Sequence, residues 1–516
     1  MSTAEKIEQL RRIKAHLRQG GGEKRIQRQH ESGKMTARER IDNLFDQHTF
    51  QEMYLFAKHR STNFGLADSE FPGDGVVTGV GTVQGRQVCV ASQDFTVSGG
   101  AVGEMHADKI VRMADLAMKS GSPLVLINDS GGARIQEGID ALGGYGRIFY
   151  GHVLLSGVVP QIAIIAGPCA GGAAYSPALM DFIIMVKGTG KLFITGPQVI
   201  KQVTGEQVTE EDLGGAYAQQ AQSGVVHLIA ENDQHALELC KQLLSYLPQN
   251  NLEDPPDYGN GELLVAPEPA LNKIIPDNPQ EAYNIKEVLL HIVDNGEMLE
   301  LQEYYAPNAI IAFARINGRS VGIIANQPMV MAGALDINAS DKISRFVRFC
   351  NAFNIPLVTF VDVPGFLPGV QQEHGGIIRH GAKMLFVYSA ATVPKITIIL
   401  RKAYGGAYLA MCGKELGADR VAAWPTGEVA VMGAEGAVNI IHRDAIKDAE
   451  DPTTTRAAFI AQYREQFANP YVGASRNLID DIIEPQDTRL YLSLALEALH
   501  TKRDVRPQKK HGLIPL

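Results

Sequence analysis

The sequence has 516 residues, 45% of them hydrophobic and 20% charged, and a net charge of −9. Single hydrophobic cores stop growing near ~250–300 residues, so we expect at least two domains. The acidic balance argues against general nucleic-acid binding, which calls for a basic face. The five cysteines lie far apart without Cys-x-x-Cys spacing, so we expect no disulfide framework, no metal site and a reduced setting.

The N-terminal stretch from Glu5 to Arg18 is charged and lacks the apolar core of a secretory signal. No apolar run reaches the ~18 residues that would span a bilayer. We therefore expect a cytoplasmic protein, and docking on a membrane complex stays open. Basic residues outnumber acidic ones over the first 40 positions. A solvated helical arm and a phosphate-binding surface for an anionic ligand are both compatible with that excess.

Strand-like and helix-like patterns alternate along the chain. Residues 1–45 are predicted to be helical, with a break at Gly20-Gly21-Gly22. Downstream, β-rich runs are joined by short turns, and apolar runs are followed by glycine turns and helical patterns. This alternation predicts the α/β class. The predicted strands cover residues 76–83, 87–92, 124–128 and 162–166, and a helical pattern continues to about residue 155.

The second half of the chain repeats landmarks of the first half in the same order and at a nearly constant offset. Asp108-Lys109 recurs as Asp341-Lys342, and Gly171-Gly172 recurs as Gly405-Gly406. Solenoid repeats recur every ~20–50 residues, so each of these much longer copies is a domain. A Pro-rich segment at about residues 245–280 is the predicted linker. Two related domains predict two related sites.

Each copy has two glycine-rich turns directly after buried strand-like runs. Such turns let the backbone pass close to a ligand and present unpaired N–H groups at a helix start. Two facing turns would form an oxyanion hole, whose single donors stabilise a transition state by ~2.7–4 kcal/mol in one protease. The four turns cover residues 129–134, 167–173, 362–366 and 402–407.

Other chemistries are less well supported. Gly188-Thr189-Gly190-Lys191 ends like a P-loop, but Met185 occupies the position of the first glycine and Leu192 replaces Ser or Thr. Ser176 is not in a Gly-x-Ser-x-Gly elbow, so a serine hydrolase is disfavoured. Several residues near the turns remain general-base candidates, although acidic residues beside glycine often cap helices. These candidates are Glu137, Asp129, Asp362, Glu373, His374 and His380.

Long segments resemble the carboxyltransferase subunits of biotin-dependent acyl-CoA carboxylases, transcarboxylases and sodium-pumping decarboxylases. The similarity covers nearly the whole chain. It includes Thr36-Ala37-Arg38-Glu39-Arg40, residues 128–137, residues 167–177, Leu335-Asp336-Ile337-Asn338, residues 362–383 and residues 401–408.

This resemblance implies two tandem crotonase-like domains built of spiral ββα units. It places the acyl-CoA domain at residues 1–262 and the biotin domain at residues 268–516. It assigns the thioester oxygen to Gly132, Ala133, Gly171 and Gly172, and the ureido oxygen of biotin to Gly365, Phe366, Gly406 and Ala407, with Gly405 and Leu409 also on the biotin side. In the family the biotin nitrogen is the base, so no catalytic side chain is required.

The resemblance also implies partners. Ser120 replaces the usual Met after Lys119 in Ala-Met-Lys, so biotin is expected on a separate carrier subunit. A homo-hexamer is implied, in which the N-terminal domain of one subunit faces the C-terminal domain of another. Leu409 stands where propionyl-CoA carboxylases usually have Asp, which favours the methylmalonyl-CoA branch.

Further partners and activities stay open. The possible partners are a biotin carboxylase, a pyruvate-side transferase or a membrane decarboxylase subunit. The alternative activities are a sodium-pumping methylmalonyl-CoA decarboxylase, an ATP-driven propionyl-CoA carboxylase component and a biotin-free crotonase-like hydrolase or isomerase.

Overall fold

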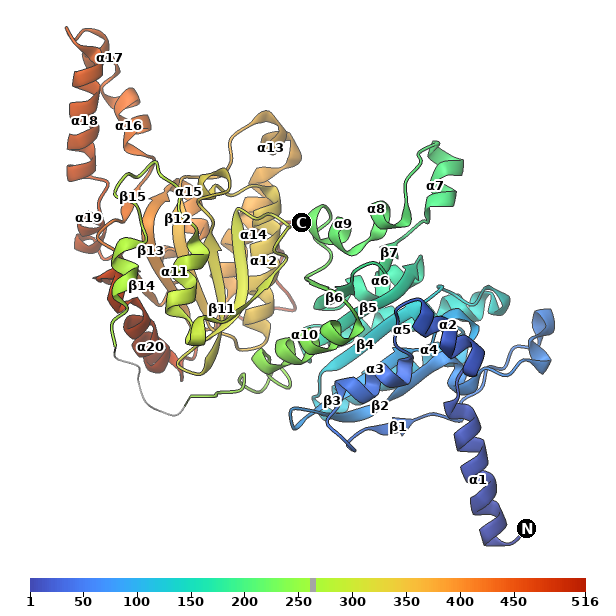
Figure 1. The fold of residues 1–516 in the computed structure, drawn as a ribbon. Coiled ribbons are helices and arrows are strands. Elements are labelled where there is room, and N and C mark those ends of the chain that lie inside the picture. The colour runs from blue at the N-terminus through green and yellow to red at the C-terminus, as the bar shows by residue number, and fades with distance from the viewer. Residues whose placement is uncertain (260–265) are drawn as a thin grey trace. The chain divides into compact units, whose positions relative to one another are not determined.

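The computed structural model describes residues 1–259 and 266–516, and the chain divides into two compact units (Figure 1). Unit 1 is Met1–Glu253 and unit 2 is Asp254–Leu516. The predicted end of the first domain, residue 262, lies outside the described residues. Among the described residues, no helix is both long and apolar enough to cross a bilayer.

Unit 1 is built on one mixed sheet with the strand order β1-β2-β3-β4-β5-β6-β8, and β7 pairs with the end of β5. β1, β2 and β3 pair antiparallel, whereas the strands from β3 onward pair parallel. Apolar runs such as Leu124–Ile127 are buried, as expected for parallel strands covered on both faces. The strands are β1 (Gln51–Met53), β2 (Val76–Val83), β3 (Arg86–Gln93), β4 (Leu124–Ser130), β5 (Gln161–Ala170), β6 (Phe182–Val186), β7 (Lys191–Phe193) and β8 (Leu228–Ala230).

Helices cover the sheet of unit 1. α4 and α5 contribute Ile110, Met113, Tyr145 and Ile148 to one core, and α3 packs against α10 and β3. α3 begins at a capping box, in which the Thr36 hydroxyl accepts from the Glu39 N–H and the Glu39 carboxylate accepts in return. The helices are α1 (Thr3–Arg18), α2 (Glu23–Glu31), α3 (Ala37–Leu44), α4 (Glu104–Ser120), α5 (Ile139–Leu155), α6 (Gly172–Ala178), α7 (Pro197–Thr204), α8 (Glu210–Gly214), α9 (Ala216–Ala221) and α10 (Asp233–Tyr246).

Unit 2 repeats this sheet, with the order β9-β10-β11-β12-β13-β14-β16 and β15 paired with the end of β13. Its strands are β9 (Met298–Leu301), β10 (Ala309–Ile316), β11 (Arg319–Asn326), β12 (Leu357–Val363), β13 (Lys395–Tyr404), β14 (Arg420–Ala423), β15 (Glu428–Ala430) and β16 (Asp481–Ile482). Its helices are α11 (Ile285–Ile292), α12 (Ile337–Ala352), α13 (Val370–Gly375), α14 (Ile377–Ala390), α15 (Gly405–Ala410), α16 (Ala434–Ile441), α17 (Arg443–Lys447), α18 (Pro452–Gln466), α19 (Pro470–Ser475) and α20 (Thr488–Leu499).

The internal repeat is a repeat of structure. The first residues of β2 and β10, of β3 and β11, of α4 and α12, and of β4 and β12 are all separated by the same offset in the sequence. The offset between β5 and β13 is longer by a single residue. The predicted α/β class and the two-copy organisation are therefore confirmed. The N-terminal helices and their glycine break are also as predicted.

The units differ in what extends from the sheet. In unit 2, α16, α17 and α18 project from the body of the unit (Figure 1).

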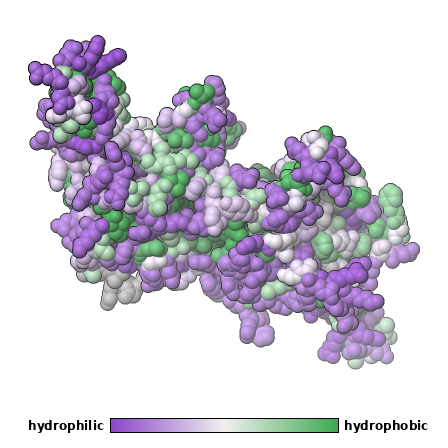
Figure 2. Space-filling model, turned by 45° about the horizontal axis from the view of Figure 1, so that its top comes forward, coloured by the Kyte–Doolittle hydropathy of each residue, from purple (hydrophilic) through white to green (hydrophobic). Residues whose placement is uncertain are grey.

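The face seen in Figure 2 is mostly hydrophilic, with small apolar patches between the charged residues. Exposed apolar side chains on α5 include Ile139, Leu142, Tyr150 and Val153.

Candidate functional site

The parallel pairing of the central strands brings two glycine turns of each unit to one sheet edge. β4 and β5 end together, with Ser130 paired to Cys169, so the segments after them lie side by side. β12 and β13 do the same through Val363 and Ala403. Within each unit the structure therefore brings together the two turns that the sequence predicted to face each other.

In unit 1, the backbone of Val102 fixes the orientation of Ala133. The Val102 N–H donates to the Gly132 carbonyl at 2.8 Å, and the Arg134 N–H donates to the Val102 carbonyl at 2.9 Å. These two bonds occupy the groups on either side of Ala133, so its own N–H points away from Val102. Among the described residues, the Ala133 N–H has no hydrogen-bond acceptor.

Unit 2 repeats this geometry around Phe366. The Leu335 N–H donates to the Gly365 carbonyl at 3.1 Å, and the Leu367 N–H donates to the Leu335 carbonyl at 2.8 Å. The Phe366 N–H likewise has no acceptor in the described part of the chain. Two unpaired donors therefore stand at matching positions of the two copies.

The second turn of each unit supplies further donors at the start of a short helix. Gly171 and Gly405 have φ angles of +60° and +59°, in the left-handed region that favours glycine. Gly172 begins α6, and Gly406 and Ala407 lie in the first turn of α15. First-turn N–H groups have no intrahelical acceptor. We call Ala133 and Gly172 the first donor pair, and Phe366 and Gly406 the second donor pair.

The space next to the two pairs differs. A Cβ atom added at Gly172 would lie 3.2 Å from the ring of Tyr145, which packs against the turn. A Cβ atom added at Gly365 or Gly406 would meet no atom within 4 Å. The second donor pair therefore borders open space on the side where a side chain would otherwise stand.

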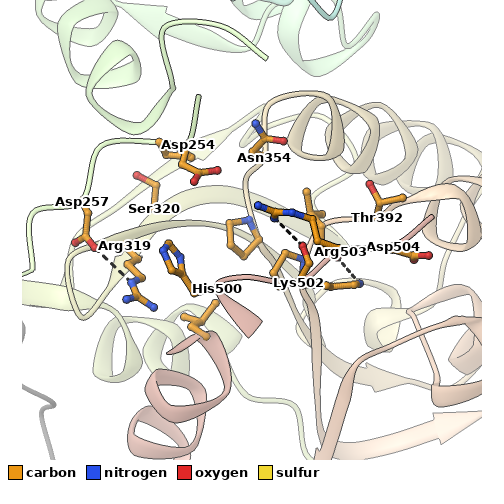
Figure 3. Close-up of a pocket in the computed structure, with 15 residues that line it drawn as sticks. Asp254, Asp257, Arg319, Ser320, Asn354, Thr392, His500, Lys502, Arg503 and Asp504 are labelled. Atoms are coloured by element: carbon orange, nitrogen blue, oxygen red, sulfur yellow. Dashed lines mark hydrogen bonds and ion pairs between the residues drawn. The ribbon is translucent and has the colours of Figure 1, made fainter. Parts of the chain in front are cut away.

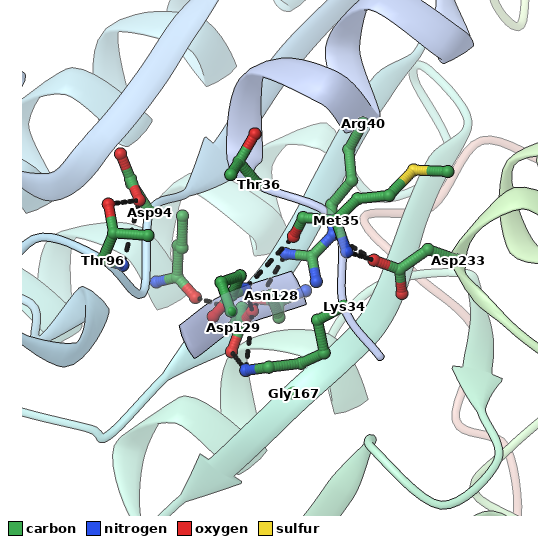
Figure 4. Close-up of polar contacts among 12 residues, drawn as sticks. Lys34, Met35, Thr36, Arg40, Asp94, Thr96, Asn128, Asp129, Gly167 and Asp233 are labelled. Atoms are coloured by element: carbon green, nitrogen blue, oxygen red, sulfur yellow. Dashed lines mark hydrogen bonds and ion pairs between the residues drawn. The ribbon is translucent and has the colours of Figure 1, made fainter. Parts of the chain in front are cut away.

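A buried carboxylate precedes the first donor pair (Figure 4). Asp129 is fully buried and receives hydrogen bonds from Lys34 Nζ at 2.9 Å and Arg40 Nη1 at 3.0 Å. Gln29 Nε2 donates to the same carboxylate at 2.9 Å. Arg40 also pairs with Asp233 at 2.8 Å, so two buried cations face two buried carboxylates.

The ion pairs of Lys34 and Arg40 with Asp129 were not predicted from the sequence. The two residues lie 95 and 89 positions from Asp129 and were grouped with the basic residues of the N-terminal segment. The sequence does contain one pattern that could have indicated a shared role, the Lys-x-x-x-x-x-Arg spacing. Lys34 lies just before α3 and Arg40 lies in its first turn, so both side chains start from the same end of one helix. That pattern alone does not identify the carboxylate they meet.

The prediction that Gly167 lets the backbone approach a ligand is wrong. β5 continues to Ala170 instead of ending at about residue 166, and Gly167 lies within it. A Cβ atom at Gly167 would lie 1.9 Å from the Asp129 carboxylate, so glycine there makes room for Asp129 and not for a ligand. The pairing of β4 with β5 is irregular between Asn128 and Ser130, which is where Asp129 sits.

Asp362 is the counterpart of Asp129 in unit 2, and its cation comes from the adjacent strand. Arg401 Nε donates to Asp362 at 3.0 Å, and the Lys402 N–H donates to it at 3.1 Å. Arg401 also lies over the ring of Tyr283 at 4.9 Å and donates to the Glu281 carbonyl.

Most of the candidate bases are already paired. Asp129 and Asp362 are in the buried ion pairs described above, and Glu137 pairs with Arg134 at 2.7 Å. His380 Nδ1 lies 2.8 Å from Asp341, which also pairs with Lys383. His374 and Glu373 lie exposed on α13.

Ser176 is held by a buried histidine. Its hydroxyl lies 3.0 Å from His152 Nε2, and His152 Nδ1 lies 2.8 Å from the Gln161 side-chain oxygen. Burial lowers the pKa of His152 to about 4, so this ring is neutral near pH 7. Ser176 is 5% exposed, which suits a support for α6 better than a nucleophile.

Two buried lysines form another repeated feature. Lys109 Nζ donates to the Gly73 and Val76 carbonyls, and Lys342 Nζ donates to four carbonyls, including that of Ala309. Burial lowers the pKa of Lys109 to about 8 and that of Lys342 to about 7. Both bind backbone only and lie one domain repeat apart.

No group of three or more His, Cys, Asp or Glu side chains in the described residues is arranged to hold a metal ion. Leu409 lies on α15 with 37% of its surface exposed. A cavity of about 280 Å³ in unit 2 lies at the other end of the sheet, beside Arg319, Pro356 and Pro394, which precede or begin β11, β12 and β13 (Figure 3). None of the predicted site residues lines that cavity.

Comparison with known proteins gives a consistent result. The model of the carboxyl transferase domain matches residues 28–514. The methylmalonyl-CoA decarboxylase alpha subunit of Propionigenium modestum is 58% identical over 513 residues, which is 99% of each chain. The methylmalonyl-CoA carboxyltransferase 12S subunit of Propionibacterium freudenreichii subsp. shermanii is 58% identical over 510 residues, covering 99% of this chain and 97% of that one.

The propionyl-CoA carboxylase beta chain of Roseobacter denitrificans is 52% identical over 510 residues, which is 99% of each chain. A crystal structure of transcarboxylase 12S, a hexamer with methylmalonyl-CoA and methylmalonic acid bound, aligns with a TM-score of 0.98 at 57% identity. The alignment covers 100% of this chain and 99% of that one. The two units are thus tandem crotonase-like α/β domains, and the chain belongs to the carboxyl transferase family.

Proposed function

We propose that this protein moves a carboxyl group between biotin and the α-carbon of propionyl- or methylmalonyl-CoA. The observation that carries the proposal is the repeated pair of unpartnered backbone donors, Ala133 with Gly172 and Phe366 with Gly406. Carboxyl transfer at an α-carbon develops negative charge on a carbonyl oxygen on each side of the reaction. Preorganised N–H groups are suited to stabilising that charge.

Unit 1 is assigned to the acyl-CoA. The N–H groups of Ala133 and Gly172 donate to the thioester oxygen as the α-carbon becomes an enolate, and Gly132 and Gly171 give those donors their orientation. Because backbone donors are fixed by the sheet and by Val102, they need no reorganisation during the reaction. Residues 1–262 are the proposed acyl-CoA domain.

Unit 2 is assigned to biotin, within the proposed domain 268–516. The open space at Gly365 and Gly406 is room that a Cβ atom would fill, and it suits a planar ring whose oxygen meets the second donor pair. When bound, biotin supplies or accepts the carboxyl group. Phe366, Gly406 and Ala407 are the donors that would hold its oxygen, with Gly405 and Leu409 beside them.

No side chain of this chain is assigned to proton transfer. Asp129, Glu137 and Asp362 are ion-paired, and His380 is held by Asp341. Glu373 and His374 lie exposed on α13. A general base typically contributes ~10²–10⁴-fold. We therefore expect His374→Ala and His380→Ala to keep turnover within about tenfold, and a loss in the full range with the fold intact would contradict this assignment.

The methylmalonyl-CoA decarboxylase and transcarboxylase branch is the favoured role. Leu409 matches that branch, and the relatives with those names are 58–59% identical, against 52% for the propionyl-CoA carboxylase beta chain of Roseobacter denitrificans. A propionyl-CoA carboxylase component is the alternative. Pull-down of the native complex separates these roles by whether a multi-span membrane protein, a pyruvate-side transferase or a biotin carboxylase co-purifies.

We propose a homo-hexamer that works with biotin borne on a separate carrier subunit. The 12S structure, a hexamer that is 57% identical, supports this assembly. A mass of the native particle near six times 55.9 kDa is expected by light scattering. A monomer with full activity would contradict the proposal, because the half-sites that meet would then have to lie in one chain.

Activity with purified protein tests the function itself. Methylmalonyl-CoA should be converted to propionyl-CoA at a rate that depends on added biotin. Heat-denatured protein serves as the control for spontaneous loss of the carboxyl group. Release of free CoA by thioester hydrolysis, or isomerisation of the acyl-CoA, in biotin-free buffer would instead support the crotonase-like hydrolase or isomerase.

A further inference from the structure

A buried guanidinium follows Ala133, one member of the first donor pair. Arg134, next to Ala133, is 1% exposed. Its Nη1 lies 2.7 Å from Asp74 and 2.7 Å from Glu137, and its Nη2 donates to the Ala101 carbonyl at 3.0 Å. One side chain thus ties the turn that holds Ala133 to Asp74 and Ala101, and to Glu137 at the end of the same segment.

Glu137 completes a closed ring of contacts around Val102. Its Oε2 accepts from the Glu104 N–H at 2.7 Å, while its Oε1 binds Arg134. Val102 itself makes the two backbone bonds that orient Ala133. The side chains of Arg134 and Glu137 therefore hold residues 101 and 104, on either side of the residue that aims the donor.

Gly103 shows how closely this ring is packed. A Cβ atom at Gly103 would lie 2.5 Å from Glu137 Oε1 and 2.6 Å from Arg134 Nη1. The φ angle of Gly103 is −99°, which any residue adopts, so glycine is required here for space and not for backbone conformation. Only a residue without a side chain lets the ion pair reach its position.

Unit 2 binds the same backbone groups with amide side chains, one of which, Asn308, also donates to the Asp336 carboxylate at 3.1 Å. The Ala334 carbonyl, which matches Ala101, accepts from Asn308 Nδ2 at 2.8 Å. The Ile337 N–H, which matches that of Glu104, donates to Gln372 Oε1 at 3.1 Å. Leu367 stands where unit 1 has Arg134. Both units therefore hold the two backbone groups that flank the orienting residue, Val102 or Leu335. Arg134 and Glu137, which we call the clamp, do so in unit 1, and the amides of Asn308 and Gln372 do so in unit 2.

We propose that Arg134 and Glu137 are positioning residues for the Ala133 donor, and that they set turnover at the acyl-CoA side without contacting the substrate. The inference rests on the proposed function for its kinetic consequence. Its structural consequence, the order of residues 131–138, stands independently of that function.

Four variants test the clamp, with kcat and KM for methylmalonyl-CoA measured at saturating biotin. Arg134→Met should lower kcat by about ten- to a hundredfold with KM within about threefold, because a misplaced donor weakens transition-state binding more than substrate binding. Arg134→Lys should restore part of the loss. Glu137→Gln should lose less than Glu137→Ala, because its amide oxygen can accept from the Glu104 N–H as Gln372 accepts from Ile337, while its NH2 group would face the Arg134 donor. Glu137→Ala should resemble Arg134→Met.

A matched control separates positioning from stability. Arg489→Met removes a half-buried ion pair with Asp294, at 2.6 Å, that lies outside both sets of turns. It should lower the melting temperature without lowering kcat. Wild-type kcat in folded Arg134→Met and Glu137→Ala, or an equal loss of kcat in Arg489→Met, would overturn the proposal.

Amide hydrogen exchange gives a readout that needs no activity. Residues 131–138 should exchange faster in Arg134→Met than in wild type, while the matching segment 364–371 of unit 2 should be unchanged. If Arg134→Met does not fold, Glu137→Ala decides by the same measurement. Unaltered exchange in residues 131–138 would overturn the proposal that Arg134 and Glu137 position Ala133. Absence of biotin-dependent turnover in the wild-type protein would overturn the proposed function alone.

Discussion

Asp129 and Asp362 occupy equivalent places before the two donor pairs, but different parts of the chain neutralise them. At Asp129 the adjacent strand has Gly167, and the cations Lys34 and Arg40 come from the N-terminal segment. At Asp362 the position equivalent to Gly167 is Arg401, which makes the ion pair itself.

The difference shows how one fold builds two equivalent turns that depend differently on the rest of the chain. The turn of unit 2 is completed by its own strands. The turn of unit 1 requires α2, α3 and the segment between them, which adds the helices that precede the sheet to the proposed acyl-CoA half-site. The contrast can be tested by changes in each unit, starting with the largest expected effect.

Asp129→Asn should destabilise the protein more than Asp362→Asn. The first change leaves two buried cations short of a carboxylate, and the second leaves one, which keeps its carbonyl and aromatic contacts. Removing one partner of a buried ion pair typically costs about 3–5 kcal/mol. Urea denaturation of both variants checks the order, and a larger effect at Asp362 would break the comparison.

Ala133→Pro and Phe366→Pro each remove one N–H donor, and the preceding glycines accept the backbone restriction that proline imposes. Loss of one such donor costs about 10²–10³-fold in turnover. We expect both variants to lose biotin-dependent activity in that range, since the proposed reaction uses both donor pairs. Turnover within tenfold of wild type in a folded Phe366→Pro variant would contradict the assignment of the Phe366 N–H to the reaction.

Acid should weaken unit 1 through His152. Burial lowers its folded pKa to about 4 from an unfolded value near 6.5, so the unfolded chain binds the proton first as pH falls. The stability contribution is complete above pH 6.5 and is lost toward pH 4, amounting to about 3 kcal/mol.

The residue that matches His152 in the second copy is Tyr388, whose carbonyl accepts from Lys395 Nζ as that of His152 accepts from Gln161 Nε2. Phenylalanine has no titratable group. His152→Phe should therefore flatten the pH dependence of unfolding between pH 6.5 and 4. Denaturation midpoints at several pH values measure this slope, and an unchanged slope in the variant would show that other groups control acid unfolding.

The smallest effect on stability is expected from Gly406→Ala. Its Cβ would meet no protein atom within 4 Å, and Gly-to-Ala in a compatible helical position changes stability by ~0.4–1 kcal/mol in the favourable direction. The methyl group would instead enter the proposed biotin space and raise KM for biotin. Gly172→Ala is the contrasting variant, because its Cβ would press on the Tyr145 ring. Equal melting temperatures for the two variants would contradict the conclusion that a methyl group has room at Gly406 but not at Gly172.

The repeat made much of the fold predictable from sequence. Landmarks kept their spacing because strands and turns of equal length recur, so the apolar strands of residues 124–128 and 162–166 could be placed. Two of the four predicted glycine turns begin too early, because residues 167–170 belong to β5 and residues 402–404 belong to β13. The short strands β7 and β15 were not predicted, because three residues carry too little periodicity to separate them from loop.

The partners of Asp129 were beyond sequence reasoning for a different reason. A basic residue on a helix looks the same whether it is solvated or buried against a carboxylate 89 positions away. Gly167 was misread because glycine between a strand and a helix commonly marks ligand approach, and only the position of the Asp129 side chain shows that the space is already filled.

Amide hydrogen exchange with each ligand separately tests most directly whether the two units hold the two substrates. The proposed donors are backbone N–H groups, so a bound oxygen should slow their exchange. Propionyl-CoA should protect residues 131–134 and 171–174, and saturating biotin should protect residues 365–368 and 405–408. Protection of one unit by both ligands, or of neither set of turns, would contradict the account.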